Sequence, residues 1–588
     1  MDYSKVASLP SAFFDKADEM GERPFLWAKT NGAYQPWSWD KVRHQVMALA
    51  SALSHLGLKK GERVLLVSEN RPEWFIADFA VMACGGITVP AYITNTSEDH
   101  EYILKDSGAG IAIVSTETLA KPLVKAAVRT NGCRLVIAME PFEVPQADAP
   151  EELHQWDTLL QEHQQASSFP QTTLEQLRRD DTACFIYTSG TGGAPKGVML
   201  SHGNILANCV GAYDLLSEFG LGRERFLSFL PLSHSYEHTV GQIFAMTIGA
   251  EIYYAEAVES LLTNISECQP TIMTAVPRLY EMLYQRINRR VEKEGRLRKY
   301  LFRQAERLGR KKYHNGEKLP LWDRPLDLLA ERTVRRSIRD RFGGHLKGMV
   351  SGGAALNTDL GLFFHALGLP ILQGYGQTEA SPVVSVNRPH RIKMDTVGPP
   401  LKGVEVRTAE DGEILVRGEL IMQGYWNRPD ETQETIREGW LHTGDIGAID
   451  DDGYIRITDR KKDIIVLSGG DNISPSRIET LLNLQPEIAQ SMVYGDKRPH
   501  LVALVVPDTE WLKSRQNDPE EAGQEAMAQA VREAVNRVNQ GLSVVEKVRR
   551  FTITTTPFTV DNDMLTPTMK IRRHVILEQY GKSLESLY

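Results

Sequence analysis

The sequence has few features of a secreted or zinc-binding protein. It holds only five cysteines, and none of them stands in a C-x-x-C pair. An odd number of cysteines cannot close entirely into disulfides within one chain, so the pattern favours a reducing compartment and gives no zinc site. The first ten residues, MDYSKVASLP, lack the basic and apolar regions of a signal peptide. We therefore expect a cytoplasmic protein.

Long apolar runs and an excess of positive charge are also missing. The most apolar stretch, residues 80–93, is interrupted by Gly85, Gly86 and Pro90 and is shorter than the ~20 residues that a membrane-spanning helix needs. The formal net charge is −9, from 67 Lys and Arg against 76 Asp and Glu. A negatively charged chain has no global attraction for phosphodiester backbones. The composition argues against a membrane-spanning protein and against a nucleic-acid partner.

The composition is that of a folded chain with more than one domain. Of the 588 residues, 42% are hydrophobic and 24% are charged, and both values are typical of soluble globular proteins. A single hydrophobic core usually stops growing near roughly 250–300 residues. A chain of this length should therefore contain at least two domains.

The first half of the chain alternates short apolar runs with amphipathic segments. Between residue 60 and about 280, the runs RVLLV, IAIV and ACFIY are bounded by Gly, Asn or Ser and separated by helical patterns. This alternation predicts βαβ units, and hence an α/β fold whose large N-terminal domain has mixed and parallel sheets flanked by helices. Residues 145–180 are polar and rich in Gln and Glu, so we expect a surface connection there.

The segment 286–347 differs from the rest of the chain in charge. It holds 20 Lys and Arg against 8 Asp and Glu, a local net charge of +12 that leaves the remainder near −21. Apolar residues recur in it at helical spacing, which predicts amphipathic helices. These residues are Val291, Leu297, Leu301, Ala305, Leu308, Leu328, Leu329, Val334 and Ile338. Two interpretations stay open: a solvated basic face, or a peripheral contact with anionic lipid on the cytoplasmic membrane face.

Residues 402–458 predict a small β subdomain. Asp411-Gly412 and Asp452-Gly453 stand between strand-like runs, and Asp-Gly is a frequent dipeptide in the turns of β-hairpins. The charged run at 459–463 looks like a linker. We therefore expect an N-terminal domain over residues 1–460 and a small α+β C-terminal domain over residues 463–588.

A loop rich in glycine and hydroxyl groups follows one predicted strand. It reads YTSGTGGAPKG over residues 187–197, directly after ACFIY. Exposed backbone N–H groups, hydroxyls and the Lys196 ammonium supply what a polyphosphate needs. The loop is not the phosphate-binding motif G-x-x-x-x-G-K-[ST], because Lys196 follows Pro195 and precedes Gly197.

Further motifs accompany this loop in a fixed order. They are residues 231–237 (PLSHSYE), 351–355 (SGGAA), 373–379 (QGYGQTE), 443–445 (TGD), 459–463 (DRKKD), 468–474 (SGGDNIS) and 565–570 (LTPTMK). Together, over nearly the whole chain, they resemble the adenylate-forming superfamily of acyl-CoA synthetases, nonribosomal adenylation domains and luciferases. The runs PLSHSYEH and PRLYEMLYQRI and the long helical insertion before SGGAA are similar to long-chain fatty acyl-CoA synthetases.

This resemblance implies a reaction in two steps. A fatty acid and ATP first give acyl-AMP and pyrophosphate, with Mg²⁺ as cofactor, and coenzyme A then takes the acyl group as a thioester and releases AMP. The resemblance also implies that the C-terminal domain is mobile and turns between the steps about Lys462, in a hinge near residues 459–463. The Gly469-Gly470 turn would then approach the channel for coenzyme A.

The resemblance assigns the remaining site residues by position. Thr188, Ser189, Gly190, Thr191 and Lys196 would wrap the ATP phosphates. Gly352, Gly353, Ala354, Gln373, Gly374, Tyr375, Thr378, Asp445 and Arg460 would bind the rest of the nucleotide, with Tyr375 stacked on adenine and Asp445 accepting hydrogen bonds from the ribose. Glu379 and Thr191 would hold Mg²⁺, and His234 would lie near the α-phosphate or the acyl pocket. The residues expected to be catalytic are Lys570, Thr191, Glu379 and His234.

Lys570 has the clearest physical role among these residues. A carboxylate that attacks the α-phosphate brings two negative groups together, and an ammonium group between them offsets that repulsion as charge develops in the transition state. One departure from the family pattern is Gly192, which stands where a second threonine is usual. We expect a changed phosphate contact there, and not lost activity.

Several alternatives stay open at this stage. The protein could be an acyl-AMP ligase that passes its product to a carrier protein, or a synthetase for a shorter-chain or aryl acid. A nucleotide- or lipid-binding protein that kept the fold and lost the chemistry is a third alternative, and a luciferase-type oxygenase is a fourth. A homodimer is also open.

Overall fold

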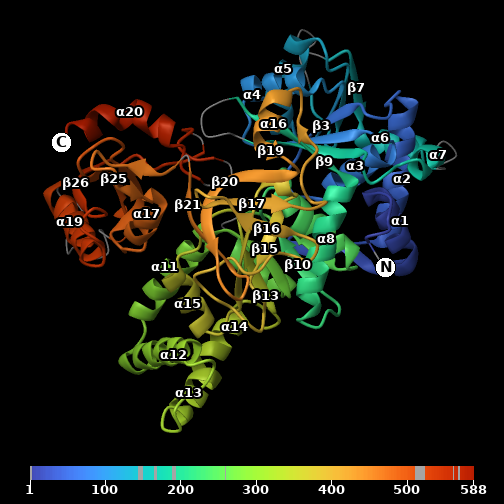
Figure 1. Ribbon diagram of the computed structural model, residues 1–588. Helices are drawn as coiled ribbons and strands as arrows, with labels where there is room; N and C mark the ends of the chain where they lie inside the picture. The colour runs from blue at the N-terminus through green and yellow to red at the C-terminus, as the bar shows by residue number, and fades with distance from the viewer. Residues whose placement is uncertain are drawn as a thin grey trace.

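The computed structural model describes residues 3–143, 150–164, 169–188, 194–257, 260–461, 463–509, 511, 524–560, 562–566 and 570–588. Each of the five cysteines lies in these ranges and is buried with a free thiol. No helix in the described part of the chain is both long and apolar enough to span a bilayer. Figure 1 shows the elements named below.

Two eight-stranded sheets form the N-terminal body, which confirms the predicted α/β class (Figure 1). The first runs in the order β18 (Gly424–Tyr425), β9 (Lys196–Ser201), β8 (Thr182–Thr188), β4 (Ile87–Ala91), β3 (Arg63–Val67), β5 (Ile111–Val114), β6 (Leu135–Ala138) and β7 (Glu152–Gln155). The second runs in the order β15 (Val383–Val386), β14 (Ile371–Gly376), β13 (Gly348–Ser351), β12 (Ile272–Ala275), β10 (Arg225–Ser228), β11 (Glu251–Tyr254), β1 (Pro24–Thr30) and β2 (Ala33–Ser38).

The apolar runs of the sequence form the centre of these sheets. Strand β3 pairs in parallel with β4 and β5, and β13 pairs in parallel with β12 and β14. The connecting helices are α3 (Pro72–Ala83), α4 (Ser97–Ser107) and α5 (Glu117–Thr130) in the first sheet. Helix α3 contributes to one hydrophobic core that contains residues of both sheets. Further helices are α1 (Leu9–Met20), α2 (Trp39–His55), α8 (His202–Ser217), η2 (Glu237–Phe244), α9 (Ala245–Thr247), α10 (Leu261–Cys268), η4 (Thr378–Ala380) and α16 (Pro429–Thr435).

The polar stretch expected to be a plain surface connection contains regular structure. Strand β7 pairs in parallel with β6, and α6 (Trp156–Glu162) and α7 (Gln171–Glu175) follow it. Trp156 is buried, at 3% exposed. Most described residues of the stretch lie at the surface, as expected. The strand was not predicted because β7 is an edge strand, and an edge strand that faces solvent does not need the apolar residues from which inner strands are recognised.

The β subdomain has the two predicted hairpins. The first joins β16 (Glu405–Thr408) to β17 (Glu413–Arg417), and the second joins β20 (Trp440–Ile449) to β21 (Ile455–Arg460), with β19 (Ile436–Arg437) beside β20. Gly412 and Gly453 have φ of 82° and 80°. A side chain is strained in that left-handed region, which explains glycine at both turns.

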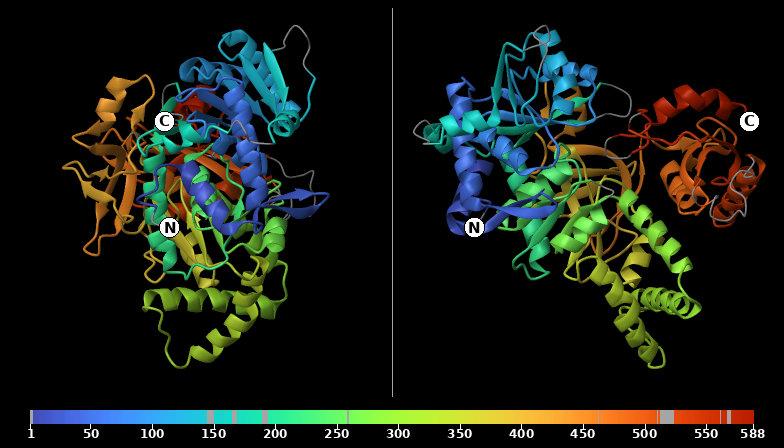
Figure 2. Two further views of the ribbon diagram at one scale, coloured as in Figure 1. Left: turned by 90° about the vertical axis from the view of Figure 1, so that its right-hand side faces the viewer. Right: turned by 180° about the vertical axis from the view of Figure 1, so that it is seen from behind.

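The C-terminal part forms a separate lobe beside β20 and β21 (Figures 1 and 2). It contains β22 (Ile465–Val466), β23 (Asn472–Ile473), α17 (Pro475–Asn483), β24 (Ile488–Tyr494), β25 (Leu501–Pro507), α19 (Gln524–Gln540), β26 (Val548–Ile553) and α20 (Arg573–Glu585). Two hydrophobic cores consist only of residues from Ile465 onward. This lobe therefore has hydrophobic cores of its own.

The basic segment is helical, as its spacing predicts. It spans the end of α11 (Pro277–Glu292), then α12 (Arg296–His314), α13 (Arg324–Ala330), η3 (Glu331–Arg335) and α14 (Arg336–Arg341). Ala305 and Leu308 are fully buried, but Leu297, Leu328 and Leu329 are 70%, 51% and 46% exposed. The predicted apolar stripe is thus only partly a packing surface.

Helix α12 packs closely on α15 (Thr358–Ala366) through Gly309. A Cβ added at Gly309 would meet the Cα of Ala366 at 2.4 Å. The backbone of Ala366 cannot move away from this Cβ as the end of a flexible side chain could. We therefore expect Gly309→Ala to lower the free energy of unfolding by about 1–3 kcal/mol. Gly581 of α20 is the matched control, because a Cβ there meets nothing within 4 Å.

We expect Gly581→Ala to raise stability by up to about 1 kcal/mol, since alanine is the better helix former. Urea unfolding of both variants measures this difference. A Gly309→Ala variant as stable as the Gly581→Ala variant would show that α12 does not lie against α15 as described.

Candidate active site

One large cavity lies where the two sheets, the β subdomain and the C-terminal lobe meet. Its volume is about 2860 Å³. It is lined by Thr188, Lys196, His234, Gly352, Gly353, Ala354, Gln373, Gly374, Tyr375, Thr378, Glu379, Asp445, Arg460 and Lys570. The fold therefore brings together residues that lie up to several hundred positions apart in the sequence.

Some predicted site residues lie either outside the described part of the chain or away from the cavity lining. Ser189, Gly190, Thr191 and Lys462 lie outside the described residues. Gly469 and Gly470 are exposed and do not line the cavity. The roles of Thr191 in metal binding, of Lys462 as the hinge and of the Gly469-Gly470 turn in the coenzyme A channel stay predictions.

The fold places the polar residues of the site at strand ends. Thr188 is the last residue of β8, Gly352 and Gly353 directly follow β13, and Gln373 to Gly376 form the end of the parallel neighbour β14. The carboxyl ends of parallel strands meet at one edge of a sheet, where ligands of α/β proteins usually bind. The motifs SGGAA and QGYGQTE meet at the cavity for this reason.

Glycine is required at position 352 by a close approach of an aromatic ring. A Cβ there would meet the ring of Tyr236 at 3.0 Å. That ring is fixed, because the Tyr236 hydroxyl donates a hydrogen bond of 2.8 Å to the Val350 carbonyl. Gly353 has a φ of 81°. The result is a flat piece of backbone that a planar group can approach.

Asp445 has two partners across the cavity. It accepts a hydrogen bond of 2.7 Å from the Tyr375 hydroxyl, and its other oxygen lies 3.2 Å from Nε of Arg460. Strand pairing sets this geometry, since Asp445 of β20 stands opposite Arg460 of β21. Burial raises the pKa of Asp445 above its ordinary value, and Arg460 and the Tyr375 hydroxyl oppose that rise.

Glu379 is a carboxylate that faces the cavity from η4, the short helix that follows β14. Its Oε1 accepts a hydrogen bond of 2.8 Å from the Tyr425 hydroxyl. In the described ranges, no group of three His, Cys, Asp or Glu is placed to hold a metal ion. Mg²⁺ prefers one or two carboxylates together with substrate phosphates and water. A single carboxylate beside a phosphate site fits that preference.

Lys196 already has a partner. Its ammonium group forms an ion pair with Glu431 and lies 4.8 Å from the centre of the Tyr425 ring. Both side chains of the ion pair are partly exposed, at 29% and 35%. Such pairs contribute little to stability, so a phosphate group can replace Glu431 at little cost.

His234 is neutral at physiological pH. Burial, and secondarily the positive charge of Lys570, lower the pKa of His234 to about 3. Its Nδ1 accepts a hydrogen bond of 3.2 Å from the Tyr236 backbone N–H. With Nδ1 accepting, the ring proton is on Nε2, so His234 can act as a neutral hydrogen-bond donor and not as a cation.

Lys570 comes from the C-terminal lobe and faces the same cavity. Loss of hydration between the walls of the cavity and the charge of Arg460 lower the pKa of Lys570, while Asp445, Asp463 and Glu379 oppose this. The lobe is thus oriented so that Lys570 lines the same cavity as His234, Asp445 and Glu379.

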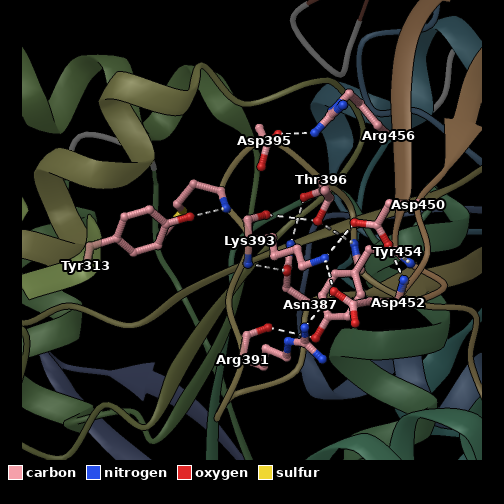
Figure 3. A network of polar contacts seen from close by, with 12 residues as sticks. Tyr313, Asn387, Arg391, Lys393, Asp395, Thr396, Asp450, Asp452, Tyr454 and Arg456 are labelled. Atoms are coloured by element: carbon pink, nitrogen blue, oxygen red, sulfur yellow. Dashed lines mark hydrogen bonds and ion pairs between the residues drawn. The ribbon is translucent and has the colours of Figure 1, made fainter. Parts of the chain in front are cut away.

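A network of polar contacts holds one wall of the cavity in place (Figure 3). The wall is the loop 394–397. Lys393 forms ion pairs of 2.6 and 2.7 Å with Asp450 and Asp452 of the β20–β21 turn (Figure 3). On the other side, the backbone N–H of Met394 donates a hydrogen bond of 2.8 Å to the Tyr313 hydroxyl of α12. The loop is therefore fixed to both the β subdomain and the helical insertion.

Gln373 is turned toward this wall. Its amide donates a hydrogen bond to the Met394 carbonyl, so it supports the loop as well as lining the cavity. Thr378 is likewise bound within the protein, through a contact of 3.0 Å between its hydroxyl and that of Ser235. Both lie at the cavity, and their roles toward a nucleotide stay predictions.

Sequence reasoning missed four residues of the site, namely Ser235, Tyr236, Tyr425 and Glu431. Ser235 and Tyr236 lie inside the motif PLSHSYE, so the motif itself pointed to them. Tyr425 and Glu431 stand in a stretch without a recognised motif. Strand β18, which carries Tyr425, pairs with β9, which carries Lys196. This long-range pairing has no sequence signal of its own.

Tyr425→Phe tests the contact with Glu379. The variant leaves one carboxylate oxygen of Glu379 without its donor, and a hydrogen bond to a charged group contributes about 1.5–3 kcal/mol. We expect kcat/KM for ATP to fall about tenfold, with a raised requirement for Mg²⁺. Steady-state kinetics measure both, and Tyr300→Phe, which removes an exposed hydroxyl on α12, should change neither. Unchanged kinetics in Tyr425→Phe would contradict a role for this contact.

The comparisons with known proteins agree with this geometry. The family model described as "AMP-binding enzyme" matches residues 13–426, and the model "AMP-binding enzyme C-terminal domain" matches residues 462–588. The chain is 32% identical over 568 residues to "Long-chain-fatty-acid--CoA ligase FadD15" of Mycobacterium bovis, covering 95% of this chain and 93% of that protein. It is 31% identical to "Long chain acyl-CoA synthetase 6, peroxisomal" of Arabidopsis thaliana, covering 100% and 87%.

Solved structures share the fold. The adenylation domain of a carboxylate reductase from Mycobacterium chelonae has a TM-score of 0.81 at 22% identity, covering 100% of this chain and 92% of that chain. The anthranilate CoA ligase AuaEII, in complex with anthranoyl-AMP, has a TM-score of 0.77 at 20% identity, with complete coverage of both chains.

The fold and the cavity define an adenylate-forming enzyme. The chain belongs to the AMP-binding enzyme family. It is an ATP-dependent ligase that activates an acid as its adenylate.

Proposed function

We propose that the protein is a long-chain fatty acid–CoA ligase that forms acyl-AMP from a fatty acid and ATP and then transfers the acyl group to coenzyme A. The main support is the identity of about 30%, over nearly the full length, to relatives with that printed activity. Further support is the size of the cavity, because about 2860 Å³ has room for a nucleotide and a long acid together.

In the proposed first step, a carboxylate oxygen of the fatty acid attacks the α-phosphorus of ATP. A new P–O bond forms, the bond to the bridging oxygen breaks, and pyrophosphate leaves with the electron pair. Thr188 and Lys196 would hold the outer phosphates, and Asp445 would hold the ribose. Lys570 would lie beside the α-phosphate and offset the repulsion between the carboxylate and the phosphate.

Mg²⁺ fits the same proposal. Glu379, aligned by Tyr425, and Thr191 would hold the ion, which when bound would neutralise phosphate charge. The flat backbone at Gly352 and the ring of Tyr375 would bind adenine between them.

In the proposed second step, the C-terminal lobe of residues 463–588 turns about Lys462 and withdraws Lys570. The thiol of coenzyme A loses its proton, its sulfur attacks the carbonyl carbon of acyl-AMP, and AMP leaves. Gly469 and Gly470 would approach the thiol arm only after that turn, which agrees with their exposed position outside the cavity in this arrangement.

We also propose that the basic segment 286–347 brings the enzyme to anionic lipid, the phase in which long-chain acids dissolve. The support is its net charge of +12 in a chain of net charge −9. A homodimer remains a further proposal, and sedimentation velocity tests it.

The test of the proposed function is pyrophosphate release across straight-chain acids from two to twenty carbons, with and without coenzyme A. We expect the rate to rise toward the long acids and acyl-CoA to accumulate only when coenzyme A is present. An optimum at short or aryl acids would overturn the long-chain assignment. Pyrophosphate release that coenzyme A does not convert to thioester would favour an acyl-AMP ligase.

A further inference from the structure

The helical insertion carries an unusual outer surface at the end of the molecule. The α12–α13 hairpin projects from the body, and α13 lies at its outer end in every view (Figures 1 and 2). Directly before α13, Leu321 and Trp322 are 71% and 79% exposed. Solvent-facing tryptophan and leucine side by side are uncommon unless they contact a partner.

This surface continues along the helix that follows. Residues of the helical stretch 324–341 that face solvent recur at spacings of three and four, as expected for one side of a helix. We define the outer face of α13–α14 as Leu321, Trp322, Arg324, Leu328, Leu329, Arg332 and Arg336. All seven side chains are exposed.

Around α13, buried carboxylates are separated from exposed arginines. Asp323 pairs with Lys311 at 2.7 Å and Asp327 pairs with Arg335 at 2.7 Å, and both carboxylate residues are buried. Three exposed arginines lack a carboxylate partner of this kind. No residue that the structure describes forms an ion pair with Arg324, Arg332 or Arg336.

From this division we propose that the outer face of α13–α14 docks on an anionic lipid bilayer, with Leu321 and Trp322 inserted among the headgroups. Tryptophan and leucine are the side chains that suit the boundary between headgroups and acyl chains, and flanking arginines bind the anionic headgroups. The chain outside residues 286–347 carries about −21, so repulsion disfavours orientations that turn this basic segment away from such a membrane. The reason for such docking rests on the proposed function, because long-chain acids reside in bilayers. The position of the docking face on the protein does not depend on that function.

The experiment is cosedimentation of the full-length protein with sucrose-loaded vesicles, either of phosphatidylcholine alone or with roughly one third phosphatidylglycerol. We expect binding to the anionic vesicles only, weakening as salt is raised. Reversing the three arginines (Arg324→Glu, Arg332→Glu and Arg336→Glu together) should lower affinity at least about 100-fold, because loss of about 1 kcal/mol for each cation at the surface already gives that factor.

The matched charge control reverses three exposed lysines elsewhere, Lys59, Lys125 and Lys402, to glutamate. It changes the net charge by the same amount and should leave binding within about twofold of the unmodified protein, because those lysines do not face the bilayer. If vesicle binding were weakened equally in both triple variants, only the total charge of the protein would matter. That result would contradict docking through the outer face of α13–α14.

Insertion is tested separately from charge. Leu321→Ala with Trp322→Ala should lower affinity about tenfold, whereas Val544→Ala, at a residue 69% exposed on the C-terminal lobe, should have no effect. Lipids brominated near the headgroups should quench part of the tryptophan fluorescence, and Trp322→Phe should bind the vesicles yet lack that part. If the brominated lipids quenched the fluorescence of Trp322→Phe as much as that of the unmodified protein, insertion of Trp322 would be contradicted.

Two further outcomes decide the proposal. If the Leu321 and Trp322 variant instead converts a dimer into a monomer and keeps vesicle binding, the face is a surface for self-association and the proposal fails. Acyl-CoA formation from a water-soluble acid, without vesicles, should be unchanged in every variant. If the unmodified protein formed no acyl-CoA from any acid but bound vesicles in this pattern, the proposed function would fail and the docking face would stand.

Discussion

Lys570→Ala should lose acyl-adenylate formation by about 100- to 1,000-fold and still convert added acyl-AMP to acyl-CoA. Lys570 is the lysine that the C-terminal lobe contributes to the cavity lining, close enough to act electrostatically on Asp445 and Glu379. Without its ammonium group, the enzyme loses the cation that is proposed to offset the repulsion between the fatty carboxylate and the α-phosphate. Pyrophosphate release measures the first half-reaction, and thioester formation from synthetic acyl-AMP measures the second.

Lys582→Ala, which removes an exposed lysine of α20, should change neither half-reaction. If Lys570→Ala slowed both half-reactions equally, Lys570 would be a structural residue and not the residue of the first step.

The pH dependence of the first step follows from the same lysine. Only the ammonium form offsets the repulsion, and the pKa of Lys570 lies below its ordinary value of 10.5. Adenylation should therefore fall as pH rises through that lowered pKa, at a pH below the ordinary lysine range. In Lys570→Arg the guanidinium stays charged, so the residual activity should lack this alkaline decline.

Asp445→Asn should lower kcat/KM for ATP by about 100-fold, mainly by raising KM. The substitution keeps the shape of the side chain but removes the charge that Arg460 and the Tyr375 hydroxyl now face. It also leaves the cations Arg460 and Lys570 in one cavity without their shared carboxylate. The two hydrogen bonds that Asp445 is proposed to accept from ribose would be weakened at the same time.

Asp451→Asn is the control for this variant, because Asp451 is an exposed carboxylate in the turn that follows the same strand. Its kinetics should match those of the unmodified enzyme. Loss of kcat with an unchanged KM in Asp445→Asn would contradict nucleotide binding as the role of this carboxylate and would point to the chemical step.

The sequence predicts most of the scaffold of this site. The run ACFIY forms β8 and ends at the cavity with Thr188, and both Asp-Gly turns close hairpins of the β subdomain. These features are local: apolar runs, turn dipeptides and motif order can be read within a few residues of each other. The paired position of Asp445 and Arg460 follows from one such hairpin.

The contacts that the sequence does not predict join residues that lie far apart along the chain. Tyr425 reaches Glu379 across 46 positions because β18 pairs with β9, and Ser235 reaches Thr378 across 143 positions. The helical spacing of apolar residues also does not show which of them pack against the protein and which face solvent. Leu308 and Leu328 stand in the same helical pattern, but Leu308 is buried and Leu328 is 51% exposed.

The product balance of the unmodified protein with ATP, Mg²⁺, coenzyme A and palmitate is the decisive measurement. We expect AMP, pyrophosphate and palmitoyl-CoA in equal amounts, and palmitoyl-AMP with pyrophosphate when coenzyme A is left out. Formation of ADP and phosphate, or of AMP without any palmitoyl-CoA, would contradict the proposed function.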